Sequence, residues 1–214
     1  MGRTPAHSHP TDAVNTPYGI ATDGIPMDMR RRKPTIGVMG STQETLPEAD
    51  RAQLAVIAES LGRAIVDQDC ILITGETTGL PEFVAQAVRK HGGFTVGISP
   101  AHSFAEHQER YGLPQESDVV IYTGFGFKGR NVINIRSSDI VVIFRGSIGT
   151  LNEFTIAYDE GKIIGILEGT GGVADHVRQI VHALAKKTQA ALFFERDAVE
   201  LLRLCLVELA RRRG

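Results

Sequence analysis

Short apolar segments that alternate with stretches of helical periodicity constrain the fold of this chain more than any other feature. The apolar segments are residues 35–40, 70–74, 94–98, 118–122, 139–144, 163–167 and 191–194. They are almost continuously hydrophobic, which is typical of strands buried on both faces of a parallel sheet. The pattern predicts an α/β protein with a Rossmann-like, doubly wound, mostly parallel sheet of about seven strands in a single domain.

Helices are predicted between these strands at residues 48–67 and 81–91, over the short segment 130–137, and at 198–212. In the first of them, Leu54, Ile57, Ala58, Leu61 and Ile65 recur at helical spacing. In sheets of this type, ligands bind beyond the carboxyl ends of the strands, where the strand order reverses. The site is therefore expected at that edge.

Residues 1–33 differ from the rest of the chain. They carry prolines at positions 5, 10, 17 and 26 and no sustained periodicity, so they cannot bury enough surface to offset the entropy of ordering. We expect a flexible arm over residues 1–33 and one Rossmann-like domain, which binds a nucleotide or phosphate, over 34–214.

The charge balance gives no case for nucleic acid or an anionic membrane as a partner. The formal net charge is −2, and the basic runs at 30–33 and 211–213 are interpreted as solvated flanks. No apolar run reaches the length of about 18 residues that a membrane-spanning helix needs. Cys70 and Cys205 each lie in an apolar stretch and are expected to be buried thiols, so we expect a cytoplasmic protein.

Glycine-rich turns follow four of the predicted strands on the same edge of the sheet. The candidate ligand-binding residues in three of these turns and the helix that follows are Gly40 and Ser41, then Gly75, Thr78 and Gly79, then Gly146, Ser147, Gly149 and Thr150. The remaining turn covers residues 124–131. Each turn alone has an ordinary explanation, because glycine permits positive φ. Together they predict a crevice lined by backbone donors.

The strongest of these signals is the turn at residues 146–150, which a β-branched strand enters and a helix leaves. Such a turn aims free N–H groups and the positive end of the helix dipole at one point, which makes an anion site. Glu153 lies one turn into the helix. Its carboxylate suggests a phosphorylated ligand that has hydroxyls or a reactive bond nearby.

Several common sites are excluded by their context. Gly124, Gly126 and Gly129 spell the dinucleotide fingerprint, but the helix predicted after them is too short for that unit. No P-loop sequence is present, and no lysine lies in a context that binds pyridoxal phosphate. His102 and His107, with nearby glutamates, fit no standard zinc signature. We expect no cofactor and no metal.

At this point three motifs carry a resemblance. Residues 75–80 are similar to the G-G-G-x-x-G-L-M-G turn, and residues 146–153 to the P-G-G-x-G-T-x-x-E turn, of the Lonely-guy (LOG) family. Arg130 and Arg136 lie upstream of Ser138-Asp139 at a spacing similar to that of the family's arginines. The Gly-Arg-Asn sequence at 129–131 looks closer still to a neighbouring branch that includes the molybdenum-cofactor carrier proteins.

The resemblance implies two functions. LOG hydrolases cleave the bond between base and ribose 5-phosphate in nucleoside 5′-monophosphates, and their catalytic arginine and glutamate match Arg130 and Glu153. The carrier proteins bind a phosphorylated pterin without obvious catalysis. In both cases the partner is a phosphorylated small molecule, and a homo-oligomer, dimer or tetramer, is implied, for which we expect the long apolar helices to form the interface.

The resemblance also assigns roles that compete with simpler ones. The phosphate would lie on the N–H groups of Gly149 and Thr150, with the hydroxyls of Ser147 and Thr78 as donors. Glu153 either stabilises positive charge on the ribose or merely complements the helix dipole. Arg136 either contacts phosphate or pairs with a nearby acid.

The chain also departs from the LOG pattern. Arg145 replaces the proline of one motif, and Glu76 and Ser147 replace glycines. Glu76 would repel a phosphate if its side chain pointed into the site, and the positive charge of Arg145 would offset that repulsion. Phe125 and Phe127 flank the ligand edge, where they either stack on a heterocycle or pack under the loop.

Overall fold

The computed structural model describes residues 32–113, 115, 117–184 and 186–213. The arm predicted over residues 1–33 lies outside the described residues except for its last two, so it stays a prediction. None of the described helices is long and apolar enough to cross a membrane.

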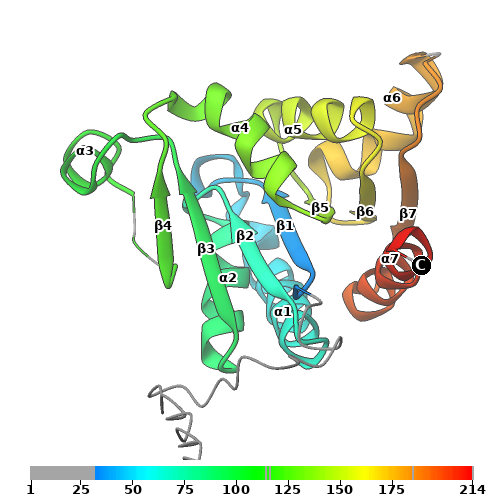
Figure 1. Ribbon diagram of the computed structural model, residues 1–214, viewed down its shortest axis with the longest axis horizontal. Coiled ribbons are helices and arrows are strands. Elements are labelled where there is room, and N and C mark those ends of the chain that lie inside the picture. The colour runs from blue at the N-terminus through cyan, green and yellow to red at the C-terminus, as the bar shows by residue number, and fades with distance from the viewer. Residues whose placement is uncertain (1–31, 114, 116, 185, 214) are drawn as a thin grey trace, which may run out of the picture. The chain divides into compact units, whose positions relative to one another are not determined.

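Seven parallel strands form one sheet in the order β4-β3-β2-β1-β5-β6-β7 (Figure 1). The strands are β1 (Thr35–Gly40), β2 (Ile71–Thr74), β3 (Phe94–Ser99), β4 (Val119–Tyr122), β5 (Ile140–Phe144), β6 (Ile163–Leu167) and β7 (Ala191–Glu195). The predicted fold class is confirmed.

Helices cover both faces of this sheet. One face carries α1 (Glu48–Asp67), α2 (Leu80–Lys90) and α7 (Ala198–Arg213), and the other carries α4 (Gly126–Ser137), α5 (Ile148–Asp159) and α6 (Val177–Leu184). The short helix α3 (Phe104–Glu109) lies beside the edge strand β4 in Figure 1. Each face has its own hydrophobic core: Ile36 and Val38 of β1 belong to the first, and Met39 to the second.

The strand order reverses at β1. The chain builds β1 to β4 outward in one direction, returns through α4, and places β5 on the other side of β1. Gly40 and Phe144 are register partners, so β1 and β5 end side by side. This is the switch point at which doubly wound sheets bind ligands.

Three helices differ from prediction. Helix α4 begins at Gly126 rather than at residue 130, because Gly124 and Gly126 adopt φ values of +69° and +64° and turn the chain directly into the helix. Their N–H groups donate to the carbonyl oxygens of Ala101 and Pro100, at 2.8 and 3.0 Å. Helices α3 and α6 were not predicted, since their six and eight residues are fewer than the window over which helical periodicity is recognised.

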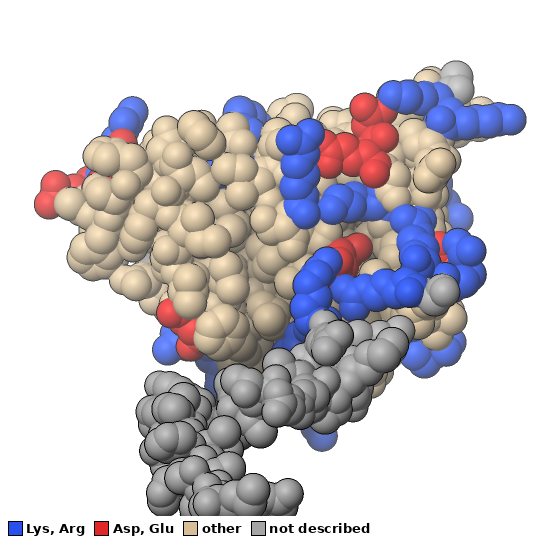
Figure 2. Space-filling view, viewed as in Figure 1, with Lys and Arg blue, Asp and Glu red and all other residues tan. Residues whose placement is uncertain are grey.

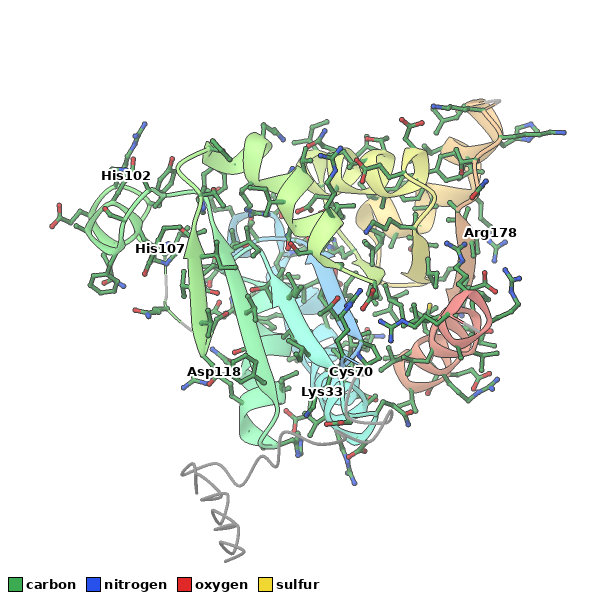
Figure 3. All side chains as sticks on the ribbon, viewed as in Figure 1. Lys33, Cys70, His102, His107, Asp118 and Arg178 are labelled. Carbon is green, nitrogen blue, oxygen red and sulfur yellow. The ribbon has the colours of Figure 1, made fainter. Side chains whose placement is uncertain are left out.

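An aspartate precedes each of the strands β4 and β5, and its carboxylate bonds to the neighbouring strand. Asp139 Oδ2 accepts hydrogen bonds from the N–H of Thr35 at 3.0 Å and from its hydroxyl at 3.1 Å. Asp118 Oδ2 accepts from the N–H and hydroxyl of Thr95, both at 2.8 Å, and Figure 3 shows Asp118 at the start of β4. Each strand was predicted to include its aspartate. Each strand begins one residue later, and at both starts the aspartate carboxylate adds hydrogen bonds to the neighbouring strand. At Asp139 the backbone also takes part, since its N–H donates to the Thr35 carbonyl oxygen at 2.9 Å.

Both cysteines are free and buried, as expected. Burial raises the pKa of the Cys70 thiol to about 11 and that of Cys205 to about 12. Both thiols are therefore protonated at neutral pH and behave as small apolar side chains.

Candidate functional site

A cavity of about 370 Å³ opens at the carboxyl ends of β1, β2 and β5, beneath the first turns of α4. We call it the switch-point cavity. It brings together seven of the residues singled out from the sequence, which are Gly40, Gly75, Arg130, Ser147, Gly149, Thr150 and Glu153. It also contains Phe127, which the sequence left as a stacking or a packing residue, and residues that were not singled out as ligand contacts, among them Thr42, Glu44, Thr45, Thr77, Lys128 and Asn131.

The N-terminus of α5 faces this cavity. Gly146 makes the sharp turn after β5 with φ of +95°, and a side chain there would collide with Thr150. Within the described part of the chain, Ser147 begins the helix without a side-chain capping hydrogen bond. A Cβ added at Gly149 would meet nothing within 4 Å. The first-turn amides of α5 are thus accessible to an anion of the size of phosphate.

The N-terminus of α2, which also lies at this edge, is closed by its own sequence. Glu82 Oε2 accepts a hydrogen bond from the N–H of Gly79 at 3.0 Å, as in a capping box. Gly79, with φ of +92°, packs against the backbone of Ser41 and Thr42, and a Cβ there would lie 2.4 Å from the Ser41 carbonyl oxygen. An anion is therefore better received at α5 than at α2.

Arg130 and Glu153 form a buried ion pair in the cavity, with Nη1 and Oε1 3.1 Å apart and only 7% and 8% of the side chains exposed. A Cβ on Gly75 would lie 2.3 Å from the guanidinium group, so glycine is needed at this turn. Burial raises the pKa of the Glu153 carboxyl and lowers the pKa of Arg130, while the opposite charge of each partner counteracts both changes.

Two amide side chains complete this group. Nη1 of Arg130 also donates to Oδ1 of Asn131 at 3.1 Å, and Asn134 Nδ2 approaches Oε1 of Glu153 at 3.5 Å. Among the described residues, Nε of Arg130 and Oδ1 of Asn134 are buried without a hydrogen-bond partner. Unsatisfied buried polar atoms are uncommon and destabilising, so two of them beside one ion pair mark this cluster as a functional candidate.

The two charged residues at departures from the LOG pattern turn away from the cavity. Glu76, with φ of +49°, is buried, and its Oε1 accepts a hydrogen bond from the N–H of Ser117 at 3.1 Å. Arg145, with φ of +58°, donates from Nη1 to the carbonyl oxygen of Thr170 at 2.7 Å and pairs with Asp50 at 3.0 Å. Neither side chain lines the cavity, so the Glu76 carboxylate would not repel an anion there and the Arg145 guanidinium would not bind it.

Five predicted ligand residues are not among those that line the switch-point cavity: Ser41, Thr78, Gly79, Arg136 and Gly146. Ser41 supports the site indirectly, because its hydroxyl accepts a hydrogen bond from the N–H of Gly146 at 3.1 Å. Thr77, rather than Thr78, faces the cavity.

Arg136 lies in the last turn of α4, toward the opposite edge of the sheet, where β5 begins. Its Nη2 donates to Glu160 Oε1 at 2.8 Å, and two-thirds of the arginine side chain is exposed. Of the two roles predicted for Arg136, the structure shows the ion pair with a nearby acid, and Arg136 is not among the residues that line the switch-point cavity. The reason is helical geometry, since Arg130 and Arg136 are more than one turn apart.

The histidine segment does not form a metal site. Within the described residues no group of three or more His, Cys, Asp or Glu side chains is arranged to hold a metal ion. His102 contacts Glu106, and His107 Nδ1 lies 2.9 Å from Ser99 Oγ in a buried setting (Figure 3). The hydrogen bond from the His102 N–H, followed by that from Arg110, lowers the pKa of Glu106 to about 2.

The fold and the cavity define a Rossmann-like α/β protein with a candidate ligand site at the switch point of its sheet. A family model described as the SLOG cluster4 family matches residues 33–202, and the chain belongs to this family. The resemblance to the LOG superfamily is thereby confirmed.

Solved structures similar to this chain include two whose names state a ligand. The molybdenum cofactor binding protein of Rippkaea orientalis is 29% identical, with a TM-score of 0.64 over 82% of this chain and 98% of that one. The molybdenum cofactor carrier protein of Chlamydomonas reinhardtii is 26% identical, with a TM-score of 0.64 over 84% and 99%. The structural-genomics target TM1055 is 26% identical, with a TM-score of 0.70 over 81% and 99%.

Proposed function

We propose that this protein binds a phosphorylated small molecule in the switch-point cavity, with the phosphate on the first-turn amides of α5. The observation that carries the proposal is the N-terminus of α5, which has no side-chain cap from Ser147 in the described chain and borders a cavity with two cationic side chains, Lys128 and Arg130. Amides and cations supply the charge-assisted hydrogen bonds that a phosphate requires. The ligand is a nucleoside 5′-monophosphate or a phosphorylated pterin.

We infer that hydrolysis of an N-glycosidic bond is the reaction that this site would perform. A water oxygen would bond to C1′ of the ribose, and the base would leave with a proton. Positive charge develops on the sugar as the bond breaks, and the Glu153 carboxylate would stabilise it. Arg130 would orient the phosphate or the departing base.

The alternative is a carrier or sensor that holds its ligand unchanged. One observation favours it: Glu153 is buried and already engaged by Arg130 at 3.1 Å, which limits its freedom to act on water or sugar. The names of the proteins from Rippkaea orientalis and Chlamydomonas reinhardtii, which refer to molybdenum cofactor, support the same alternative.

Two measurements separate the hydrolase from the carrier. Mass spectrometry of the protein purified under native conditions identifies a ligand that copurifies, and chromatography measures free base released from a panel of purine, pyrimidine and modified nucleoside monophosphates. For a hydrolase, Glu153→Gln and Arg130→Ala lower the rate of release by orders of magnitude. A carrier releases no base, and its ligand is recovered intact.

The matched controls are Glu160→Gln and Arg136→Ala. Arg136 and Glu160 also bridge α4 and α5, but they do so outside the switch-point cavity. A hydrolase that loses activity equally in these controls would have lost it through the helix pair and not through the site. A protein that neither carries a phosphorylated ligand nor binds ribose 5-phosphate would refute the proposal as a whole.

We further propose that the protein forms a homo-oligomer in the cytoplasm, without nucleic acid or membrane as partner. The long helices expected as the interface expose apolar side chains, Val56 on α1 and Val199 and Val207 on α7. A second set of exposed apolar side chains, Phe94, Val119 and Ile121, lies on β3 and β4. Figure 2 shows few charged side chains over this part of the molecule. Sedimentation velocity of the full chain tests for a dimer or tetramer.

A further inference from the structure

The geometry points to Phe127 as the residue that selects ligands with a planar heterocycle, by stacking its ring on theirs at the mouth of the switch-point cavity. This inference rests on the proposed function and adds the part of the ligand that is not phosphate. The sequence left Phe125 and Phe127 with two equal interpretations, as stacking residues or as packing residues. Their positions in the structure differ, and the difference decides between the two interpretations.

Phe127 belongs to the cavity, whereas Phe125 does not. Among the described residues that line the cavity Phe127 is the aromatic one, and 46% of it is exposed. Phe125 precedes α4, is 67% exposed, and is absent from the described lining. A packing residue would be covered by the protein, whereas Phe127 retains an accessible surface in the lining of the cavity.

The ring lies on the same helical face as the charged centre of the site. Phe127 and Arg130 are three residues apart on α4, so their side chains project to the same side of the helix. The guanidinium group packs against Gly75 and pairs with Glu153 of α5, the helix whose first-turn amides border the same cavity. A ligand with its phosphate at Gly149 and its polar middle at Arg130 would extend its remaining part toward Phe127.

Tyr111 holds the Phe127 ring in place. The two ring centroids are 5.2 Å apart with an interplanar angle of 85°, which is a favourable edge-to-face arrangement. The Arg110 guanidinium carbon lies 5.4 Å from the centroid of the Tyr111 ring and steadies this partner in turn. A ring that is braced on one side and exposed on another is suited to stacking, because little conformational entropy is lost when a ligand binds.

Stacking accounts for the chemistry of this wall better than general apolar contact. The lining also holds Lys128, Arg130 and Asn131, which lie with Phe127 on α4 and carry N–H donors. Arg130 and Asn131 have partners within the protein, Glu153 and Asn152. An aliphatic ligand group would offer no hydrogen-bond acceptor to any of the three. A nitrogen heterocycle offers a π-face to Phe127 and ring acceptors to the neighbouring donors.

The experiment compares three probes by isothermal titration calorimetry on the full chain: adenosine 5′-monophosphate, guanosine 5′-monophosphate and ribose 5-phosphate. We expect the native protein to bind both nucleotides on the order of tenfold more tightly than ribose 5-phosphate, in keeping with the usual contribution of one aromatic stack. In Phe127→Leu this preference disappears while the affinity for ribose 5-phosphate stays the same. The Phe127→Tyr protein should show the same preference for nucleotides as the native protein, because tyrosine keeps the aromatic ring. The control Phe125→Leu should also show it.

Each other outcome counts against the inference. Equal binding of all three probes by the native protein overturns the stacking role while leaving the phosphate site standing. A Phe127→Leu protein that still prefers nucleotides also overturns it. So does a folded Phe127→Leu protein that has lost affinity for the nucleotides and for ribose 5-phosphate alike. Urea unfolding of the variant establishes that it is folded. If the native protein binds none of the probes, the inference fails, and the proposed function fails with it when mass spectrometry also finds no phosphorylated ligand that copurifies.

Discussion

The ion pair between Arg130 and Glu153 makes a sharp prediction about stability. In Glu153→Gln the amide oxygen still accepts a hydrogen bond, but the guanidinium loses its counter-charge at a position where 7% of its side chain is exposed. Breaking a buried pair from one side costs about 3–5 kcal/mol. Because one hydrogen bond survives, we expect the lower end, about 3 kcal/mol of the free energy of unfolding. A domain with about 5–15 kcal/mol of stability remains folded after this loss.

Urea unfolding followed by circular dichroism gives the free energy by linear extrapolation. Glu160→Gln is the matched control, because its partner Arg136 is 66% exposed, and it should change stability far less. The double variant Arg130→Met with Glu153→Leu should recover most of the loss, since apolar residues of similar volume replace both charges. Equal effects of Glu153→Gln and Glu160→Gln would refute the reasoning that the first pair is desolvated.

Three further predictions concern other parts of the chain. Gly149→Ala should leave the free energy of unfolding unchanged or slightly higher, because the added methyl group meets no atom within 4 Å and alanine favours a helix. Calorimetry should nevertheless show weaker binding of ribose 5-phosphate, because the methyl group narrows the approach to the α5 amides. Asp118→Ala should lower the free energy of unfolding by about 1–3 kcal/mol, since the N–H and hydroxyl of Thr95 lose their acceptor in a buried position; an Asp118→Ala protein as stable as the native one would contradict this. Cys70 and Cys205 should resist iodoacetamide at about pH 8 until urea is added, because their raised pKa values keep them protonated. For the same reason the free energy of unfolding should fall above about pH 9, because the thiols ionise at lower pH in the unfolded chain than in the folded one.

The architecture was predictable because the signals for it are local. Continuous apolar runs such as residues 140–144 identify strands buried on both faces, and the bounds Thr35–Gly40, Glu48–Asp67 and Ile163–Leu167 agree with the predicted ones. The misses were ends and short elements. At Asp118 and Asp139 the aspartate carboxylate bonds to the neighbouring strand just before the assigned strand begins, and no propensity reveals this contact.

The candidate site was predictable in outline and not in detail. Glycine turns at strand ends located the cavity, and the resemblance to the LOG family implied that Arg130 and Glu153 belong to one site. Placing the start of α4 at residue 130 hid the periodicity that joins Phe127 to Arg130. Arg136 looked equivalent to Arg130 in the sequence, although its exposed position on α4 became visible only once the helix had been built.

Glu76 and Arg145, both in left-handed conformation, follow the strands on either side of β1. Each ties its own turn to a more distant segment, Glu76 to Ser117 and Arg145 to Thr170. The turns at the mouth of the cavity are therefore held by hydrogen bonds to distant segments and do not behave as independent loops. Substitutions in those segments, outside the cavity, should alter its shape as much as substitutions in its lining.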